Sequence, residues 1–101
     1  MRRLTFKISK YSRLRINFIK LKNNKLYTFK IVDDYKSASF DFNYSIALRA
    51  IGKYLNIDLE LFLKENCYKN KNGILYFEQK TLDKIIPYLE SLIIINKLIG
   101  E

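Results

Sequence analysis

Apolar and polar residues alternate along three segments in the N-terminal third of this 101-residue chain. In residues 3–8 (RLTFKI), the leucine, phenylalanine and isoleucine would lie on one side of an extended strand, with the polar residues on the other. The same period of two recurs over residues 14–18 and 27–31, and it is typical of strands with one buried face. The polar residues 22–25 (KNNK) separate the last two segments, which predicts a hairpin with a positively charged tip.

The middle of the chain is harder to assign. Residues 33–39 have the composition of a loop. Asn43 is placed to cap a helix that would run to about Leu55 with apolar residues on one stripe. The same segment also alternates in part, so helix and strand both remain open there. Residues 59–63 (LELFL) alternate and predict a short strand.

The C-terminal third predicts a turn, a strand and two helices. Residues 69–73 (KNKNG) are rich in turn-forming types, and residues 74–77 predict a buried strand. From Gln79 the spacing of apolar residues becomes helical. Pro87 should kink or end that helix, and a second short helix should then run from Ser91 to Ile99.

Together these patterns predict an α+β fold with a small, mostly antiparallel sheet and two or three short helices. We expect a basic N-terminal extension over residues 1–13 and a single domain over residues 14–101, because a chain of this length forms one modest core. The helical stripe over residues 82–89 is expected to pack in that core rather than to bind a partner.

Charge is distributed unevenly along the chain. Residues 1–32 carry ten Lys and Arg and no acid, whereas residues 33–101 carry nine basic and ten acidic residues, so the net charge of +9 divides into +10 and −1. Ten unbalanced cations repel one another, which favours a polyanionic partner. Lys and Arg supply most of the non-specific affinity for nucleic acid, and interleaved aromatic residues can stack on unpaired bases. Phe18 and Phe29 alternate inward with isoleucines, however, and are expected in the core.

Catalytic chemistry finds little support in the sequence. The chain has no histidine, the commonest general base and metal ligand, and its single cysteine, Cys67, is expected to be a small buried residue. Asp33 and Asp34, with Asp41 further on, could hold a metal ion in a nuclease, although capping or pairing with Lys36 is the simpler interpretation. We therefore expect no enzymatic activity, no cofactor and no small-molecule substrate.

Composition also bears on origin and location. Ile, Lys, Asn, Tyr and Phe make up 52 of the 101 residues, and all five have AT-rich codons, which points to an AT-rich genome such as that of a mitochondrion. The longest apolar run, Leu92–Ile95, is too short to cross a bilayer. We therefore expect a mitochondrial protein that does not span the membrane.

Several short stretches occur in the order seen in one ribosomal family. They are Leu14–Ile16, the basic loop 22–25, Phe29–Val32, Asp34 with Lys36-Ser37, and residues 51–56 (IGKYLN). In this order they resemble the bacterial-type small ribosomal subunit protein sixteen family.

That resemblance implies a strand over residues 48–54, and a strand followed by two short helices over residues 77–99. The glycine and proline of the family's basic loop, and its Gly-Arg-Phe turn, are missing here.

A second resemblance involves the later part of the chain. Residues 48–57 (LRAIGKYLNI) and 67–90 (CYKNKNGILYFEQKTLDKIIPYLE) look like the later half of a LAGLIDADG homing endonuclease repeat. The defining helix of that family, with its metal-binding acid, is absent. This resemblance therefore implies a catalytically dead binder of nucleic acid.

We accordingly predict a structural constituent of an organellar, mitochondrial small ribosomal subunit that contacts ribosomal RNA and neighbouring ribosomal proteins. The alternatives are a scaffold subunit of an organellar membrane complex, a dead homing-endonuclease-like binder and, least favoured, an active nuclease. The predicted RNA-binding residues are Arg2, Arg3, Lys7, Lys10, Tyr11, Arg13, Arg15, Lys20, Lys22, Lys25, Lys30, Tyr35 and Lys36.

Overall fold

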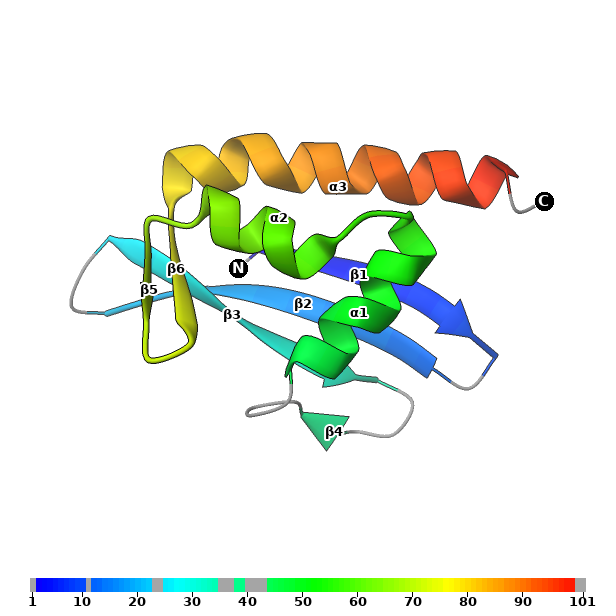
Figure 1. The fold of residues 1–101 in the computed structure, drawn as a ribbon, viewed down its shortest axis with the longest axis horizontal. Helices are drawn as coiled ribbons and strands as arrows, with labels where there is room; N and C mark the ends of the chain where they lie inside the picture. The colour runs from blue at the N-terminus through cyan, green and yellow to red at the C-terminus, as the bar shows by residue number, and fades with distance from the viewer. Residues whose placement is uncertain (1, 11, 23–24, 35–37, 40–43, 100–101) are drawn as a thin grey trace.

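The computed structural model describes residues 2–10, 12–22, 25–34, 38–39 and 44–99, and it has the predicted α+β class (Figure 1). The elements, in chain order, are β1 (Arg2–Ser9), β2 (Ser12–Lys20), β3 (Leu26–Asp33), β4 (Ala38–Ser39), α1 (Tyr44–Leu55), α2 (Leu59–Asn66), β5 (Lys69–Lys71), β6 (Ile74–Glu78) and α3 (Gln79–Ile99).

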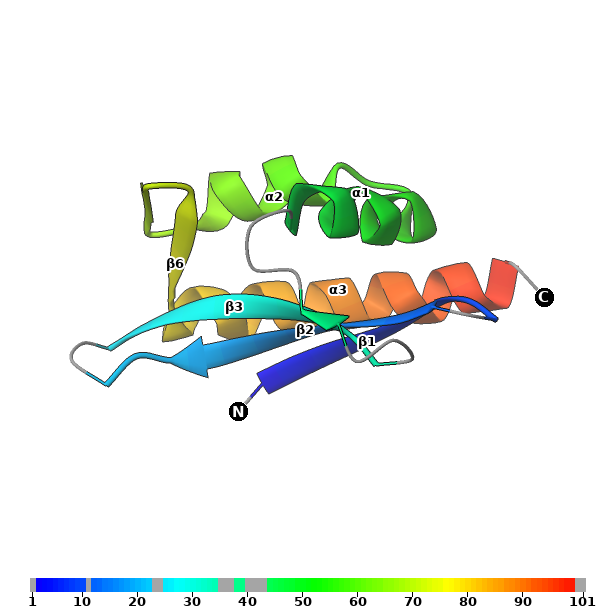
Figure 2. The same cartoon turned by 90° about the horizontal axis from the view of Figure 1, so that it is seen from below.

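One sheet and one layer of helices make up the fold. The strand order is β1-β2-β3-β6-β5, every neighbouring pair is antiparallel, and the short strand β4 pairs with the end of β3. All three helices lie on the same side of β1, β2 and β3, so the other side of these strands carries no covering layer within the described chain (Figure 2). That one-sided arrangement places the candidate site described below.

The three N-terminal strands form where the alternating pattern predicts them. Leu4 and Phe6 of β1 and Ile16 and Phe18 of β2 are almost completely buried, while the residues between them are exposed or half-buried. In register, Leu4 lies opposite Ile16, and Phe18 lies opposite Phe29 of β3. Side chains that are opposite in a sheet share a face, so the alternation of all three strands places one common apolar face under the helices.

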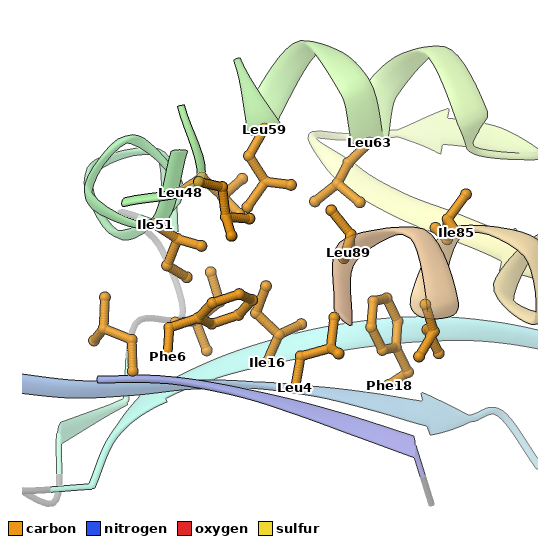
Figure 3. Close-up of a cluster of buried hydrophobic side chains, with 14 of the residues drawn as sticks. Leu4, Phe6, Ile16, Phe18, Leu48, Ile51, Leu59, Leu63, Ile85 and Leu89 are labelled. Atoms are coloured by element: carbon orange, nitrogen blue, oxygen red, sulfur yellow. The ribbon is translucent and has the colours of Figure 1, made fainter. Parts of the chain in front are cut away.

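The helices complete this core from above. Figure 3 shows Leu48 and Ile51 of α1 pointing toward the apolar face of the sheet, and Leu63 of α2 and Leu89 of α3 pointing toward each other. Each of these four side chains is fully buried. The stripe over residues 82–89 of α3 is therefore part of the core, as predicted.

The segment left open between helix and strand is helical. α1 spans Tyr44–Leu55, and Leu48, Ile51 and Leu55 are buried at the spacing of one helix face. The strand over residues 48–54 that the ribosomal-family resemblance implies is therefore absent from this fold. The predicted cap, Asn43, lies outside the described residues.

The prediction of a strand over residues 59–63 is wrong, because these residues begin helix α2. The side chain of Asp58 accepts a hydrogen bond from the backbone N–H of Leu61 at 3.1 Å and so caps the first turn. Leu59 and Leu63, four residues apart, are both buried. The alternation LELFL thus satisfies a helical spacing as well, and capping together with burial selects the helix.

Pro87 was predicted to kink or end its helix, and it does not end it, because α3 continues through Pro87 from Gln79 to Ile99. Pro87 is exposed, whereas Ile86 and Leu89 on either side of it are buried. A proline inside a helix costs roughly 3 kcal/mol. Packing of both halves of α3 on the same core offsets that cost, and Ser91, predicted to start a new helix, instead donates its Oγ–H to the carbonyl of Tyr88 at 2.6 Å.

The two hairpins and the N-terminal segment agree with the sequence predictions in part. The β2–β3 hairpin and the strand over residues 74–77 are confirmed. Residues 69–71 of the predicted turn form β5, and only Asn72 and Gly73 make the turn itself. Most of the segment expected as an N-terminal extension is β1, which belongs to the same sheet and core as the rest of the chain.

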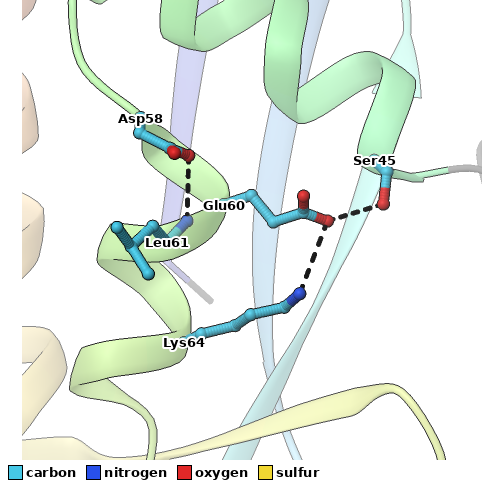
Figure 4. Close-up of polar contacts among 5 residues, drawn as sticks. All are labelled: Ser45, Asp58, Glu60, Leu61 and Lys64. Atoms are coloured by element: carbon cyan, nitrogen blue, oxygen red, sulfur yellow. Dashed lines mark hydrogen bonds and ion pairs between the residues drawn. The ribbon is translucent and has the colours of Figure 1, made fainter.

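A network of polar contacts fixes the corner between α1 and α2 (Figure 4). Ser45 donates its Oγ–H to Glu60 Oε2 at 2.6 Å, and Lys64 Nζ lies 3.9 Å from the same oxygen. Beneath this corner, the backbone N–H of Ile57 donates to the carbonyl of Gly52 at 3.0 Å. A Cβ on Gly52 would stand 2.6 Å from the carbonyl oxygen of Ile57, so the corner requires glycine here.

We expect Gly52→Ala to destabilise the protein by about 1–3 kcal/mol, although alanine is the better helix former, because the clashing atom belongs to the backbone and cannot turn aside. Urea unfolding followed by circular dichroism would measure this. Gly73→Asn is the matched control, since Gly73 has φ +81° with open space around it and asparagine tolerates that conformation. A Gly52→Ala variant as stable as the wild type would contradict the packing described.

Candidate nucleic-acid interface

The uncovered side of β1, β2 and β3 forms a surface that we call the open sheet face. Its residues alternate with the core residues of the same strands and are exposed or half-buried. The open sheet face consists of Arg3, Thr5, Lys7, Arg13, Arg15, Asn17, Ile19, Thr28, Lys30 and Val32.

Strand register brings the cations of this face together. Lys7 lies opposite Arg13, while Asn17 lies between Arg3 on one side and Lys30 on the other. Side chains that face each other across antiparallel strands have Cβ atoms roughly 4.5–5.5 Å apart, and like charges in such positions repel. The fold therefore concentrates positive charge on this face at some cost to its own stability.

The acidic side chain of Asp34 contacts this face. Asp34 Oδ1 lies 3.0 Å from Arg15 Nη2, and the backbone N–H of Asp34 donates to the carbonyl of Arg13 at 2.8 Å. Both members of the ion pair are more than a quarter exposed, so the pair is worth at most about 1 kcal/mol. Asp34 therefore offsets one charge of the open sheet face and leaves the face strongly positive.

The predicted acidic cluster is divided between the two sides of the sheet. Asp33 is buried, with an exposed fraction of 3%, and occupies a core-facing position of β3, whereas Asp34 reaches Arg15 on the open sheet face. Asp41 lies outside the described residues. Within the part of the chain that the structure describes, no group of three or more His, Cys, Asp or Glu is placed to hold a metal ion.

Two polar atoms in the middle of the open sheet face have no hydrogen-bond partner among the described residues. They are Nε of Arg15 and Oδ1 of Asn17, each buried as an atom although its side chain is half-buried as a whole. The two residues are two positions apart on the central strand β2, so both project from the same side. An unsatisfied buried polar atom costs about 1–3 kcal/mol, and a ligand would reach these two atoms only after their side chains moved, because both atoms are buried.

The predicted binding residues fall into three groups in the structure. Arg3, Lys7, Arg13, Arg15 and Lys30 come together on the open sheet face. Four further exposed lysines lie at its two ends, in the β1–β2 turn and around the β2–β3 hairpin: Lys10, Lys20, Lys22 and Lys25. The side chains of Arg2, Tyr11, Tyr35 and Lys36 lie outside what the structure describes.

Sequence analysis missed Asn17, which completes the central row between Arg3 and Lys30. Its position in the alternation, two residues after Arg15, was the available signal. Lys69 and Lys71 were predicted as turn residues, whereas they lie on strand β5. Only the pairing of β5 with β6 shows which side of the hairpin they occupy.

The aromatic residues of the N-terminal strands do not belong to the open sheet face. Phe18 packs against Phe29 and Phe77, with ring centroids 6.1 and 6.0 Å apart, inside the core. The inward assignment of Phe18 and Phe29 is thereby confirmed. No residue of the open sheet face is aromatic, so this surface offers charge and hydrogen bonds rather than rings for stacking.

Comparisons with known proteins identify no relative of this chain. No protein-family model matches the chain, and no curated protein or solved structure is significantly similar to it. Among the described residues, no helix combines the length and the apolar character needed to cross a membrane.

Removing the carboxylate at position 34 should strengthen binding of a polyanion. We expect Asp34→Asn to raise the affinity for heparin roughly two- to fivefold, the equivalent of one exposed ion pair, because Arg15 loses its internal partner. Titration calorimetry would measure this. Glu90→Gln is the matched control, because it makes the same change of net charge at an exposed position of α3 in the helix layer. Equal effects of both variants would show that net charge alone, rather than the open sheet face, governs binding.

Proposed function

We propose that this protein binds double-helical nucleic acid through the open sheet face and catalyses no reaction. The observation that carries the proposal is the clustering of Arg3, Lys7, Arg13, Arg15 and Lys30 in neighbouring rows on a side of the sheet that none of the described helices covers. Phosphates are the ligand that such a surface fits, because each Lys or Arg that neutralises a phosphate releases a condensed counterion.

The chemistry of the surface favours a double helix over a single strand. Proteins that bind single strands combine cations with aromatic side chains on which bases stack. Among the residues that the structure describes, the open sheet face has cations, an asparagine and two threonines but no aromatic residue. Contacts of this kind go to phosphates, sugars and base edges, and those to phosphates fix a duplex in position.

Ribosomal RNA of an organellar small subunit is the ligand that the sequence favours. The charge imbalance, the AT-rich composition and the ribosomal-family resemblance support it. In this proposal the open sheet face would hold the phosphates of one RNA helix, and neighbouring ribosomal proteins would contact other parts of the chain. The helix over Tyr44–Leu55 departs from the strand that the resemblance implies, so the charge pattern carries more of the argument than the resemblance does.

Duplex DNA is the second candidate, and a specific observation favours it. Arg15 and Asn17 stand in the middle of the open sheet face with unpaired polar atoms, and Arg and Asn are the side chains that recognise guanine and adenine edges. The major groove of B-form DNA admits a β-ribbon, whereas that of A-form RNA is too deep and narrow for side chains to reach the bases. This candidate corresponds to the catalytically dead homing-endonuclease-like binder.

The scaffold alternative gains less from the structure. A scaffold subunit would have to offer the apolar face of α3 to a partner, but most of that face is core, since Leu82, Ile85, Ile86 and Leu89 are buried. Ile94 and Ile95 of α3 are exposed, but no described feature indicates what would cover them.

Neutralising three exposed cations of the open sheet face should weaken duplex binding strongly. For Arg3→Gln/Lys7→Gln/Lys30→Gln we expect the slope of log K against log salt to become shallower by about 3, and the affinity to fall on the order of a hundredfold near ~0.1 M salt. Fluorescence anisotropy with blunt 20-bp duplexes of RNA and DNA would measure both. The matched control is Lys53→Gln/Lys84→Gln/Lys97→Gln, which removes the same charge from exposed positions of the helices.

The two triple variants decide between a localised and a diffuse interaction. Equal losses in both would contradict the assignment of binding to the open sheet face. A preference for RNA over DNA of the same sequence supports the ribosomal ligand, and the reverse preference supports the second candidate. Sedimentation of a mitochondrial lysate with and without RNase then shows whether the chain travels with the small ribosomal subunit through RNA.

A further inference from the structure

The β5–β6 hairpin carries a second cationic surface, distinct in composition from the open sheet face. Lys69 pairs with Tyr76 and Lys71 pairs with Ile74, so these four side chains share one side of the hairpin. Lys69 Nζ lies 5.1 Å from the centre of the Tyr76 ring, and no acidic residue occurs between Cys67 and Phe77. The hairpin therefore combines cations with aromatic rings, which the open sheet face does not.

The conformation of this hairpin is fixed by its turn. Asn72 and Gly73 have φ angles of 55° and 81°, both in the left-handed region, and they are the two residues between β5 and β6. Two-residue turns with positive φ at both positions match the twist of antiparallel strands and give a tight connection. The cations and rings of the hairpin are thus presented on a preformed support.

The side chain of Tyr68 stands at the start of this hairpin and is 60% exposed. Its backbone N–H donates to the carbonyl of Tyr76 at 2.7 Å, which fixes the position of its backbone beside the cationic side of the hairpin. A large ring that is mostly in solvent contributes little to the core. An exposed ring one residue before Lys69 in the chain has the chemistry of a stacking platform for a nucleobase.

Strand register makes the hairpin continuous with the open sheet face. Leu26 of β3 pairs with Glu78 of β6, and alternation along β6 places Tyr76 and Ile74 on the same side of that strand as Glu78. Glu78 lies at this junction, and its carboxylate is 3.9 Å from Lys80 Nζ. A nucleic acid that leaves the open sheet face across β3 therefore meets the hairpin next.

The direction of the hairpin decides which kind of nucleic acid can follow it. Figure 2 shows β6 turning away from the plane of β2 and β3 toward the helix layer. A duplex is stiff over about 150 bp and would continue straight past this bend. A single strand can bend and follow the surface onto the hairpin, where aromatic rings and lysines suit its bases and phosphates.

We propose that the β5–β6 hairpin binds a short single-stranded extension of the duplex held on the open sheet face, with Tyr68 stacking on an unpaired base and Lys69 and Lys71 contacting its phosphates. The inference rests on the proposed function, and it assigns the protein to junctions between paired and unpaired nucleic acid rather than to uninterrupted duplex.

The test compares a blunt 20-bp duplex with the same duplex carrying four unpaired nucleotides at one end, by fluorescence anisotropy, for each polarity of the overhang in RNA and in DNA. We expect the wild-type protein to bind at least one overhang substrate about fivefold or more tightly than the blunt duplex, as expected for one stacked base. Tyr68→Ala should abolish this gain and leave the affinity for the blunt duplex unchanged. Tyr68→Phe should keep the gain, because phenylalanine retains the ring.

Tyr88→Ala is the matched control, since Tyr88 is 45% exposed on α3 in the helix layer and its loss should not change the gain. Circular dichroism would confirm that each variant is folded. If the wild type binds blunt duplex but gains nothing from any overhang, or if Tyr68→Ala keeps the gain, this inference is overturned and the proposed function stands. Absence of any duplex binding overturns the proposed function and this inference together.

Discussion

The structure depends on the burial of a single face of the three N-terminal strands beneath the helices. Phe6, Ile16 and Phe18 can be buried there only if every second residue of the same strands points the other way. Because all three helices are used on the apolar side, the polar side remains uncovered within the described chain. An open basic surface is thus a direct consequence of how the core is made, and covering it with a further helix layer would require costly burial of unpaired charges.

The positive charge gathered on that surface works against folding. Lys7 faces Arg13 across the β1–β2 pair, and Asn17 has a cation on either side. A sequence selected for stability alone would intersperse acids among these positions. The ion pair between Arg15 and Asp34 offsets one charge of the face and is partly exposed. In the proposed function, phosphates would neutralise this repulsion, whereas the unpaired Oδ1 of Asn17 is an acceptor and would need a donor group of the ligand.

The two parts of the proposed interface differ in ways that follow from their elements. The open sheet face offers cations on a broad support of paired strands, suited to the regular phosphates of a duplex. The β5–β6 hairpin offers Tyr68 and Tyr76 beside lysines on a tight turn that bends away from the sheet. Together they would distinguish nucleic acids by the position of a junction between paired and unpaired regions, without any recognition of base sequence at the hairpin.

Alternation in the sequence determined the three long strands, the β2–β3 hairpin and the inward positions of Phe18 and Phe29, because a period of two has one structural interpretation when it recurs on neighbouring strands. The charge imbalance also indicated which third of the chain would carry the basic surface.

Tertiary structure alone decided the conformation of residues 59–63. The sequence LELFL fits a strand or a helix, and the helix forms because Asp58 caps its first turn and Leu59 and Leu63 are buried in the core. Tertiary structure also decided that α3 continues through Pro87. The sequence shows the cost of a proline inside a helix, but it does not show that burial of Ile86 and Leu89 in the core offsets that cost. Strand register places Asn17, Lys69 and Tyr76 on one continuous surface. Register depends on how segments distant in the chain pair with one another, so no single segment of the sequence reveals it.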